Sequence, residues 1–430
     1  MSNDGALLKE LADFYAKASA FSKDADLSPI WQMNRAYTIN DLIASAEPFA
    51  EKLKKIHSGT FYSLIHRADV LNYQTQWWVD VLASAGINVD AMAAHVTEAP
   101  IVGSEMKTTM ASGRVVSPDL MRRLAHVGYI SQKFAMPQGR MRVLELGGGF
   151  GALGRVFKMF YPQATYYIVD LPVTLYFSGG FLKSCFPDRK ILLVGSEEEY
   201  RNADRDSYDY ILVPSGLHHI IHGETFDLFM NTHSMGEMPN HVVEQWFDMI
   251  QNKLNVKRIF MLNRYLNRVF SEFRRNENKG SVLFDPHWAI KYWEFEPPFM
   301  RCPFAETPEN QCALVMAERV QPEYRNPAAN AQRSDALANY VMQQDWVKTT
   351  NSFNPYLNPN RIMIYPERYQ DYTMNGTLFK LWESIRLNPT VANTSLMIQY
   401  LKYINILGEN FEEYYFYLQL HIQCMRAAGR

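Results

Sequence analysis

The sequence has few cysteines, no long apolar run and almost no net charge. Among its 430 residues only Cys185, Cys302, Cys312 and Cys424 are cysteines, and their spacing gives no CxxC pair and so no zinc or redox motif. No run of about 18 apolar residues could span a membrane. The acidic N-terminus lacks the apolar core of a signal peptide. We therefore expect reduced thiols in a cytoplasmic protein.

Neither sign of charge dominates, and this bears on the class of partner. Lysine and arginine total 43 against 45 for aspartate and glutamate, so no global positive field draws the chain to nucleic acid or anionic lipid. Aromatic residues, in contrast, reach 13% and suit a large core or apolar pockets with polar tips. We expect a small-molecule partner, and neither nucleic acid nor a membrane.

The chain divides into three regions by the spacing of its apolar residues. Residues 1–115 repeat apolar side chains at helical spacing. Residues 116–320 alternate short β-rich runs with helical stretches, which predicts α/β architecture with a mostly parallel sheet. Residues 321–430 are helical and irregular again. We predict a helical N-terminal lid, substrate or oligomerisation region, a central α/β domain, and a helical C-terminal region, with a homo-oligomer through the helical flanks as an open alternative.

The central region has one strand-like run more than a simple alternation needs. Either 191–194 or 210–213 is an inserted strand, because both precede the run at 226–230. The runs at 289–296 and 312–318 have only a loop between them and are typical of an antiparallel hairpin. The parallel sheet is therefore predicted to end in a reversed strand.

The most specific motif is a glycine-rich turn between a strand and a helix, VLELGGGFGALG at 143–154. Glycines are needed where the backbone takes a positive φ or approaches a ligand without a Cβ in the way. The N–H groups at the start of the following helix point into the same space. The loop therefore predicts a cradle for a nucleotide-like ligand, with candidate contacts from Gly147, Gly149, Phe150 and Gly151.

An acid follows the loop at the spacing that ribose binding needs, because Asp170 ends the next strand, just before Leu171. The GxGxxG pattern alone fits NAD as well as S-adenosylmethionine. Glu145, inside the first strand, favours S-adenosylmethionine, because a carboxylate suits a cationic cofactor and would repel a pyrophosphate. The predicted hairpin favours it too. NAD binding and a mere packing turn stay open as alternatives.

A second motif, FDLFMNTHSMGEMP at 226–239, predicts a strand, a polar loop and a helix. Ligands of doubly wound sheets bind at the carboxyl ends of the strands. His233, Ser234 and Glu237 are therefore predicted to lie where a substrate meets the cofactor. The alternatives are a surface histidine and an acid that stabilises a helix start.

Two further residues are candidate substrate contacts, His218 and Arg264. His218 belongs to a histidine cluster with His219 and His222, but no acid cluster accompanies it, and we predict no metal site. Arg264 ends a predicted strand and suits a phosphate or carboxylate of the substrate, with a salt bridge at the rim of the sheet as the alternative.

These motifs resemble the bacterial sugar O-methyltransferases, a branch of the class I S-adenosylmethionine-dependent methyltransferases. The stretch from Glu145 to Gly151, Asp170 with its neighbours and, above all, the run from Asn231 to Glu237 carry the resemblance, which covers roughly residues 100–320. It implies a Rossmann-like methyltransferase domain over 116–320 with an antiparallel terminal hairpin and S-adenosyl-L-methionine as cofactor. It also implies cofactor contacts that include Glu145, Leu171 and Asn231.

A hydroxyl acceptor would need a general base, which contributes about 10²–10⁴-fold to the rate. His233 titrates near neutrality and is the predicted base, with Glu237 as its orienter or a second base. We expect methyl transfer to a hydroxyl of a small metabolite, such as a sugar or a nucleotide sugar. The alternatives are transfer to nitrogen or another use of the same cofactor, an NAD-dependent oxidoreductase, and a non-catalytic binding module.

Overall fold

The computed structural model describes residues 4–22, 31, 39–56, 79–80, 82–83, 86–101, 108–110, 112–264, 288–295 and 312–319. The chain divides into two compact units, which we describe separately. Unit 1 comprises Met1–Arg264 and Glu296–Cys312, and unit 2 comprises Tyr265–Phe295 and Ala313–Arg430. The helical region predicted at 321–430 lies outside the described residues, and the domain boundaries at 115 and 320 stay predictions.

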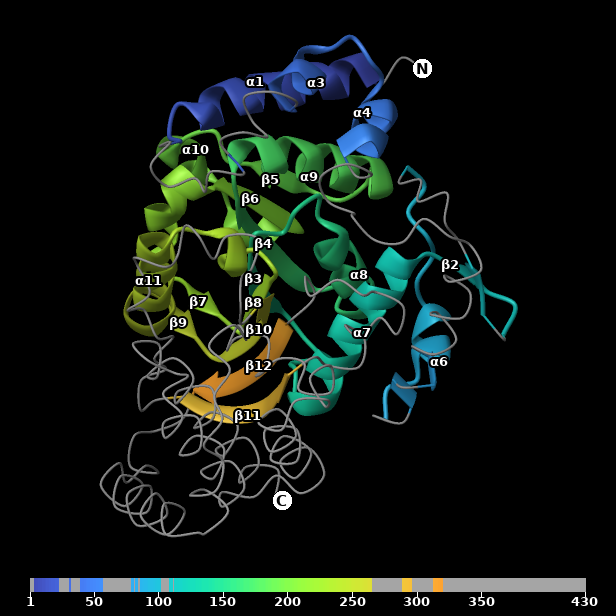
Figure 1. Cartoon of the computed structure of the whole chain (residues 1–430). Coiled ribbons are helices and arrows are strands. Elements are labelled where there is room, and N and C mark those ends of the chain that lie inside the picture. The colour runs from blue at the N-terminus through green and yellow to red at the C-terminus, as the bar shows by residue number, and fades with distance from the viewer. Residues whose placement is uncertain are drawn as a thin grey trace, which may run out of the picture. The chain divides into compact units, whose positions relative to one another are not determined.

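Parallel strands form the main sheet of unit 1, in the order β10-β8-β3-β4-β6-β5 (Figure 1). The short strand β5 lies at the edge beside β6, so the inserted strand is the run at 191–193. The strands are β3 (Met141–Leu146), β4 (Ala164–Asp170), β5 (Ile191–Leu193), β6 (Tyr210–Pro214), β8 (Leu228–Thr232) and β10 (Arg258–Arg264). Two-residue strands form an antiparallel pair, β1 (Thr108–Thr109) with β2 (Val115–Val116), and a parallel pair, β7 (Thr225–Phe226) with β9 (Asn255–Val256).

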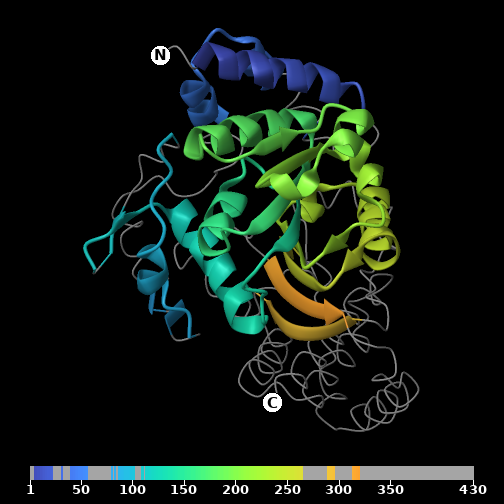
Figure 2. The same ribbon diagram turned by 180° about the vertical axis from the view of Figure 1, so that it is seen from behind.

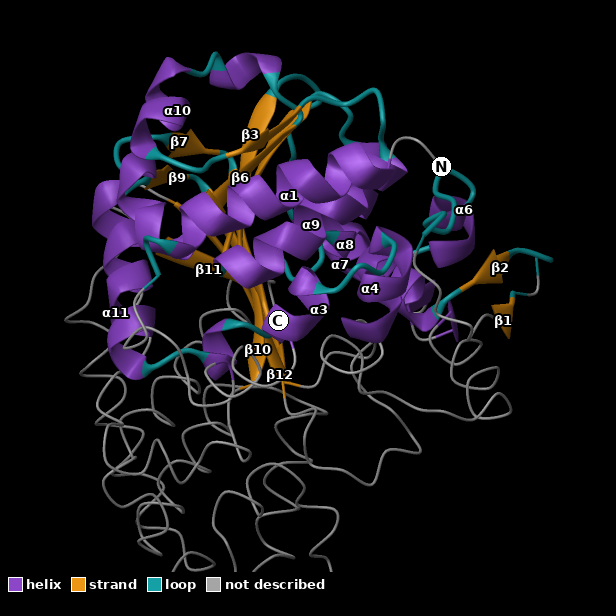
Figure 3. Ribbon diagram, turned by 90° about the horizontal axis from the view of Figure 1, so that it is seen from above, coloured by secondary structure: helices purple, strands orange, loops and turns teal. Residues whose placement is uncertain are grey.

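Helices cover both faces of this sheet. Figure 3 shows α7 (Pro118–Lys133), α8 (Ala152–Phe160) and α9 (Pro172–Cys185) on one face, and α10 (Glu197–Asn202) and α11 (Asn240–Asp248) on the other. The N-terminal helix α1 (Asp4–Ser19) packs on the outside of α9 (Figures 1 and 2). The shorter helices are α3 (Asn40–Ala44), α4 (Phe49–Ile56), α6 (Val89–Ala93), the 3₁₀ turns η4 (Arg205–Ser207), η5 (Ser215–Ile221) and η6 (Met235–Glu237), and the π-helical turn η7 (Met249–Lys253). None of the helices in the described ranges has the length and apolarity that a membrane crossing requires.

The core of unit 1 lies around the central strands. Leu144 of β3 pairs in register with Tyr167 of β4 and Phe229 of β8, and all three are fully buried. Strands covered by helices on both faces carry continuous apolar runs and do not alternate with polar residues. Because the strands run parallel, all their carboxyl ends lie along one side of the sheet, the carboxyl edge, where the loops that follow the strands come together. Their amino ends lie along the opposite side, the amino edge.

The described residues of unit 2 form an antiparallel pair. Strand β11 (Trp288–Phe295) pairs with β12 (Cys312–Arg319), with an irregularity between Ile290 and Tyr292. This confirms the predicted hairpin. The predicted α/β class, a mostly parallel Rossmann-like sheet with an antiparallel terminal pair, is confirmed as well.

Candidate functional site

The glycine loop connects the end of β3 to the start of α8. Gly147 has a φ of 73° and Gly151, which precedes α8, a φ of 89°, a left-handed conformation that strains any residue with a Cβ. The N–H of Gly147 donates to the carbonyl of Val169 at 2.8 Å, which attaches the loop to β4. The predicted order of strand, glycine turn and helix is confirmed.

Gly147 is also the point where the loop after β8 comes closest. A Cβ on Gly147 would lie 2.0 Å from Oγ of Ser234. That hydroxyl donates to the carbonyl of Leu146 at 3.0 Å, and the side-chain amide of Asn231 donates to the same carbonyl at 2.8 Å. The amide of Asn231 also donates to Oγ of Ser234 at 2.6 Å. The structure therefore brings Gly147, Asn231 and Ser234 together, and their predicted contacts with cofactor and substrate stay predictions.

Asp170, the last residue of β4, holds the loop from its other side. Its carboxylate accepts hydrogen bonds from the N–H of Gly149 at 2.9 Å and from the N–H of Leu171 at 2.7 Å. Burial raises the pKa of Asp170 to about 7, although both hydrogen bonds favour the ionised form. The carboxyl group is thus poised to change its charge near neutral pH. The predicted contact of Asp170 with a ribose stays a prediction.

Glu145 lies beneath the loop, with 1% of its surface exposed. The hydroxyl of Tyr166 donates to its Oε2 at 2.8 Å, and this oxygen would lie 3.0 Å from a Cβ on Gly148. Burial raises the pKa of Glu145 to about 7. The carboxyl group therefore supports the loop from within the core, and its contact with the cofactor stays a prediction.

His233 follows β8 in a strained backbone conformation. Its φ is 67°, the only positive φ outside glycine in the described ranges, and its N–H donates to the carbonyl of Leu262 at 2.6 Å. Non-glycine residues keep such a conformation where the surroundings determine it, which is frequent at functional sites. The structure thus places the predicted base at the carboxyl end of a central strand.

A second histidine near this position was missed from the sequence. His126 on α7 is fully buried, and its ring lies 5.7 Å from the ring of Phe260. Burial, together with the charges of Arg123 and His233, lowers the pKa of His126 well below its usual value. His126 is therefore neutral at physiological pH. Its only signal in the sequence is a histidine among the apolar residues of a helix.

Glu237 ends the turn η6 and contacts the N-terminal region. The indole N–H of Trp31 donates to its Oε2 at 3.2 Å, and the backbone N–H of Glu237 donates to the carbonyl of Ser234 at 2.9 Å. Glu237 is half-buried. Sequence reasoning missed Trp31, because nothing in its local pattern points to a residue 206 positions away.

His218 and Phe150, two of the other predicted residues, contact residues outside this cluster. His218 in η5 contacts the carbonyl of Ser215 at 2.6 Å and the ring of Trp246 on α11. Phe150 is buried and packs edge-on against Phe181 at 5.0 Å. Arg264 ends β10 as predicted, but its side chain lies outside the described part. Within the described ranges no group of three His, Cys, Asp or Glu side chains could hold a metal ion.

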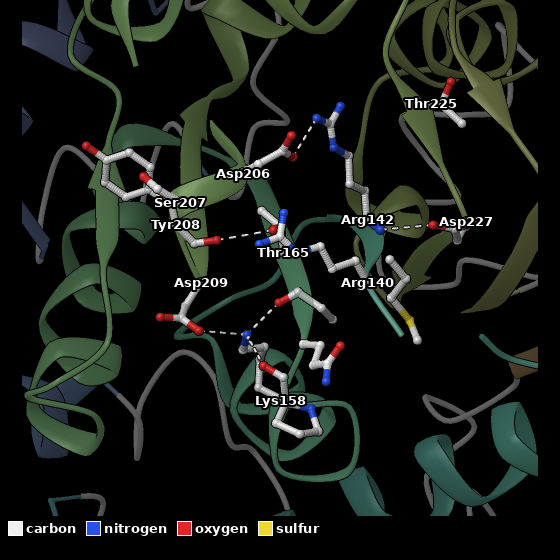
Figure 4. A pocket seen from close by; sticks show the side chains of 14 residues that line it. Arg140, Arg142, Lys158, Thr165, Asp206, Ser207, Tyr208, Asp209, Thr225 and Asp227 are labelled. Carbon is white, nitrogen blue, oxygen red and sulfur yellow. Dashed lines mark hydrogen bonds and ion pairs between the residues drawn. The ribbon is translucent and has the colours of Figure 1, made fainter. Parts of the chain in front are cut away.

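The opposite, amino edge of the sheet has a polar pocket of about 690 Å³ (Figure 4). At its base Nζ of Lys158 donates to Oδ1 of Asp209 at 2.8 Å, and Arg142 pairs with Asp206 at 2.7 Å. The hydroxyl of Thr165 donates to the carbonyl of Tyr208 at 3.2 Å. These polar groups pair with one another at the amino ends of the strands.

No protein-family model and no curated protein sequence matches the chain. Solved structures that are similar include mitomycin 7-O-methyltransferase MmcR, with 12% identity, a TM-score of 0.28 and coverage of 46% of this chain and 57% of that one. The pyocyanin biosynthetic protein PhzM has 11% identity and a TM-score of 0.30, over 67% of this chain and 83% of that one. Magnesium protoporphyrin IX methyltransferase from Synechocystis PCC 6803, with bound S-adenosylhomocysteine, has 8% identity and a TM-score of 0.30, over 63% and 99%.

Proposed function

We propose that this chain is a class I S-adenosylmethionine-dependent O-methyltransferase that methylates a hydroxyl group of a small metabolite, with a sugar or a nucleotide sugar as the expected acceptor. One observation carries the proposal. The glycine loop, Asp170 and the linked Asn231 and Ser234 converge at the carboxyl edge of a parallel sheet, which is where doubly wound folds bind nucleotide-like ligands.

The residues at this edge fit such a cofactor. Gly147 has no room for a Cβ, and the glycine loop presents backbone N–H groups at the start of α8. Asp170 offers carboxylate oxygens to ribose hydroxyls, and Asn231 holds the adjoining loop in place. When bound, S-adenosylmethionine supplies the activated methyl group, and the protein supplies orientation and proton transfer.

His233 and Glu237 are assigned the proton transfer. A hydroxyl group is a weak nucleophile at neutral pH, so a base that removes its proton accelerates transfer. His233 lies at the end of the central strand β8, and Glu237 follows four residues later in η6. In this proposal His233 accepts the proton, and Glu237 orients the imidazole of His233 or acts as a second base. Ser234, His218 and Arg264 are the proposed acceptor contacts.

Calorimetry tests the cofactor assignment. We expect S-adenosylhomocysteine to bind the full chain with a micromolar or lower dissociation constant, and NAD to show no binding. NAD binding without S-adenosylhomocysteine binding would favour an oxidoreductase and overturn the proposal.

A screen of hydroxylated metabolites and nucleotide sugars with isotope-labelled S-adenosylmethionine tests the reaction, with product detected by its mass shift. We expect His233→Ala to lower kcat by about 10²–10⁴-fold and to leave the affinity for S-adenosylhomocysteine within a factor of two. The matched control is His219→Ala, since His219 is exposed and pairs with Glu197. Full activity of His233→Ala would exclude the histidine as base and favour a nitrogen acceptor.

A further inference from the structure

Trp31 joins the N-terminal region to the loop that carries the proposed base. Its indole N–H can only donate, so the 3.2 Å contact with Oε2 of Glu237 is a hydrogen bond from a neutral donor to a carboxylate. Both side chains are half-buried. Hydrogen bonds to charged groups are stronger than those between neutral groups, and partial burial reduces competition from water.

The contact continues towards the glycine loop. The backbone N–H of Glu237 donates to the carbonyl of Ser234, and the hydroxyl of Ser234 lies against Gly147. Trp31 is therefore linked to the cofactor loop through two intermediate residues, all within unit 1. The indole of Trp31 therefore lies close enough to the glycine loop to report on a ligand bound there.

We propose that Trp31 is a positioning residue for methyl transfer, which fixes the orientation of the Glu237 carboxylate next to the acceptor. This inference rests on the proposed function. It assigns the N-terminal region a part in the chemistry, because the donor that holds Glu237 comes from before residue 40. Replacing the indole by a ring without N–H removes this restraint and keeps most of the packing.

The first test is spectroscopic and needs no acceptor. In ¹⁵N-labelled protein, the indole N–H signal of Trp31 is identified by its loss in Trp31→Phe. We expect the chemical shift of this signal in Glu237→Ala to differ from that in the wild type. In the wild type, we expect it to change when S-adenosylhomocysteine is added. A signal that is unaffected by Glu237→Ala would overturn the contact and with it the proposal.

The second test uses the pool of hydroxylated metabolites as acceptor probe. We expect Trp31→Phe to lower kcat about tenfold, because it removes the hydrogen bond to the Glu237 carboxylate, and to change the dissociation constant of S-adenosylhomocysteine by less than twofold. Tyr15→Phe is the matched control, because it removes another N-terminal hydrogen bond, to Asn40 at 2.7 Å, away from the site.

The outcomes separate the two proposals. Unchanged kcat in Trp31→Phe, or an equal loss in Tyr15→Phe, would show that Trp31 is merely structural. Failure of the wild type to bind S-adenosylhomocysteine would overturn the proposed function itself, whatever the indole signal shows.

Discussion

The pKa values of aspartates at the carboxyl edge and at the amino edge of the parallel sheet are shifted in opposite directions. At the carboxyl edge, burial raises the pKa of Asp170 to about 7. At the amino edge, burial alone would raise the pKa of Asp209, but the hydrogen bonds and charges of Lys158 and Arg189 outweigh it and the pKa falls. The difference follows from the partners of the two groups, since Asp209 is paired with cations and Asp170 is buried among backbone N–H groups.

The carboxylates of the two edges differ in their partners. Asp209 forms ion pairs with Lys158 and Arg189, and Asp206 forms one with Arg142. In the described part of the chain neither Glu145 nor Asp170 has an ion-pair partner, and their hydrogen bonds come from a tyrosine and from backbone N–H groups. Perturbed acids of this kind gather at functional sites.

The largest effect on stability is expected at the amino edge. Lys158 is 3% exposed and donates to Asp209 and two backbone carbonyls. Lys158→Met therefore leaves both carbonyls without this donor and leaves the partly buried carboxylate with Arg189 as its one remaining ion-pair partner among the described residues. We expect the free energy of unfolding in urea to fall by about 3 kcal/mol. The affinity for S-adenosylhomocysteine should stay within twofold.

Lys257→Met is the matched control for this change. Its ion pair with Asp227 is exposed, so we expect a loss of at most about 1 kcal/mol. If Lys158→Met weakened S-adenosylhomocysteine binding tenfold or more, the two edges would not be separable in the way proposed.

A glycine substitution at the carboxyl edge should have the next largest effect. Gly147→Ala introduces a Cβ at positive φ and within 2.0 Å of Ser234, which must move. We expect the dissociation constant of S-adenosylhomocysteine in calorimetry to rise about 100-fold, equivalent to about 2.7 kcal/mol. Gly223→Ala is the matched control, because Gly223 has a similar φ of 80° and open space around the added Cβ. It should lower the free energy of unfolding through backbone strain alone and leave the dissociation constant of S-adenosylhomocysteine unchanged.

The smallest effect concerns the pH dependence of stability. The pKa of Glu145 rises from 4.5 to about 7 on folding, so the folded state binds more protons and the free energy of unfolding falls as pH rises between these values. Glu145→Gln should remove this part of the fall, on the order of 2 kcal/mol between pH 5 and pH 8. Urea unfolding at the two pH values measures it.

Asp206→Asn provides the comparison from the other edge. The hydrogen bond and charge of Arg142 lower the pKa of Asp206, so its contribution is complete above its ordinary pKa and is lost only in more acidic solution. It should therefore leave the difference between pH 5 and pH 8 unchanged. An equal change in both variants would contradict the assignment of the titration to Glu145.

Local patterns predicted much of this fold. The glycine loop, Asp170 and the strand at 228–232 lie within short segments whose glycine and apolar spacing determine their shape. Glu145 shows where such patterns stop. Its charge predicts a cofactor contact, which stays a prediction, and a strand buried on both faces gives no alternation from which to predict the side to which the carboxylate turns.

The contacts that span long distances in the sequence could not be predicted. Trp31 and Glu237 are 206 positions apart in the sequence and meet only in the folded unit 1, and His126 comes close to His233 through the position of α7. The choice between two candidate inserted strands was also left open, because both runs have the composition of a strand and only their pairing places β5 at the edge.

The packing of α1 on α9 limits how the chain can be shortened. Most of α9 is buried, and a Cβ on Gly180 would lie 2.2 Å from the ring of Phe49, while Leu11 of α1 lies against Gly179. Removal of α1 would expose the apolar surface of α9 to solvent, and large exposed apolar patches promote aggregation. We therefore expect a chain that begins after residue 110 to aggregate, so point substitutions in the 430-residue chain are the better test of a role for the N-terminal region.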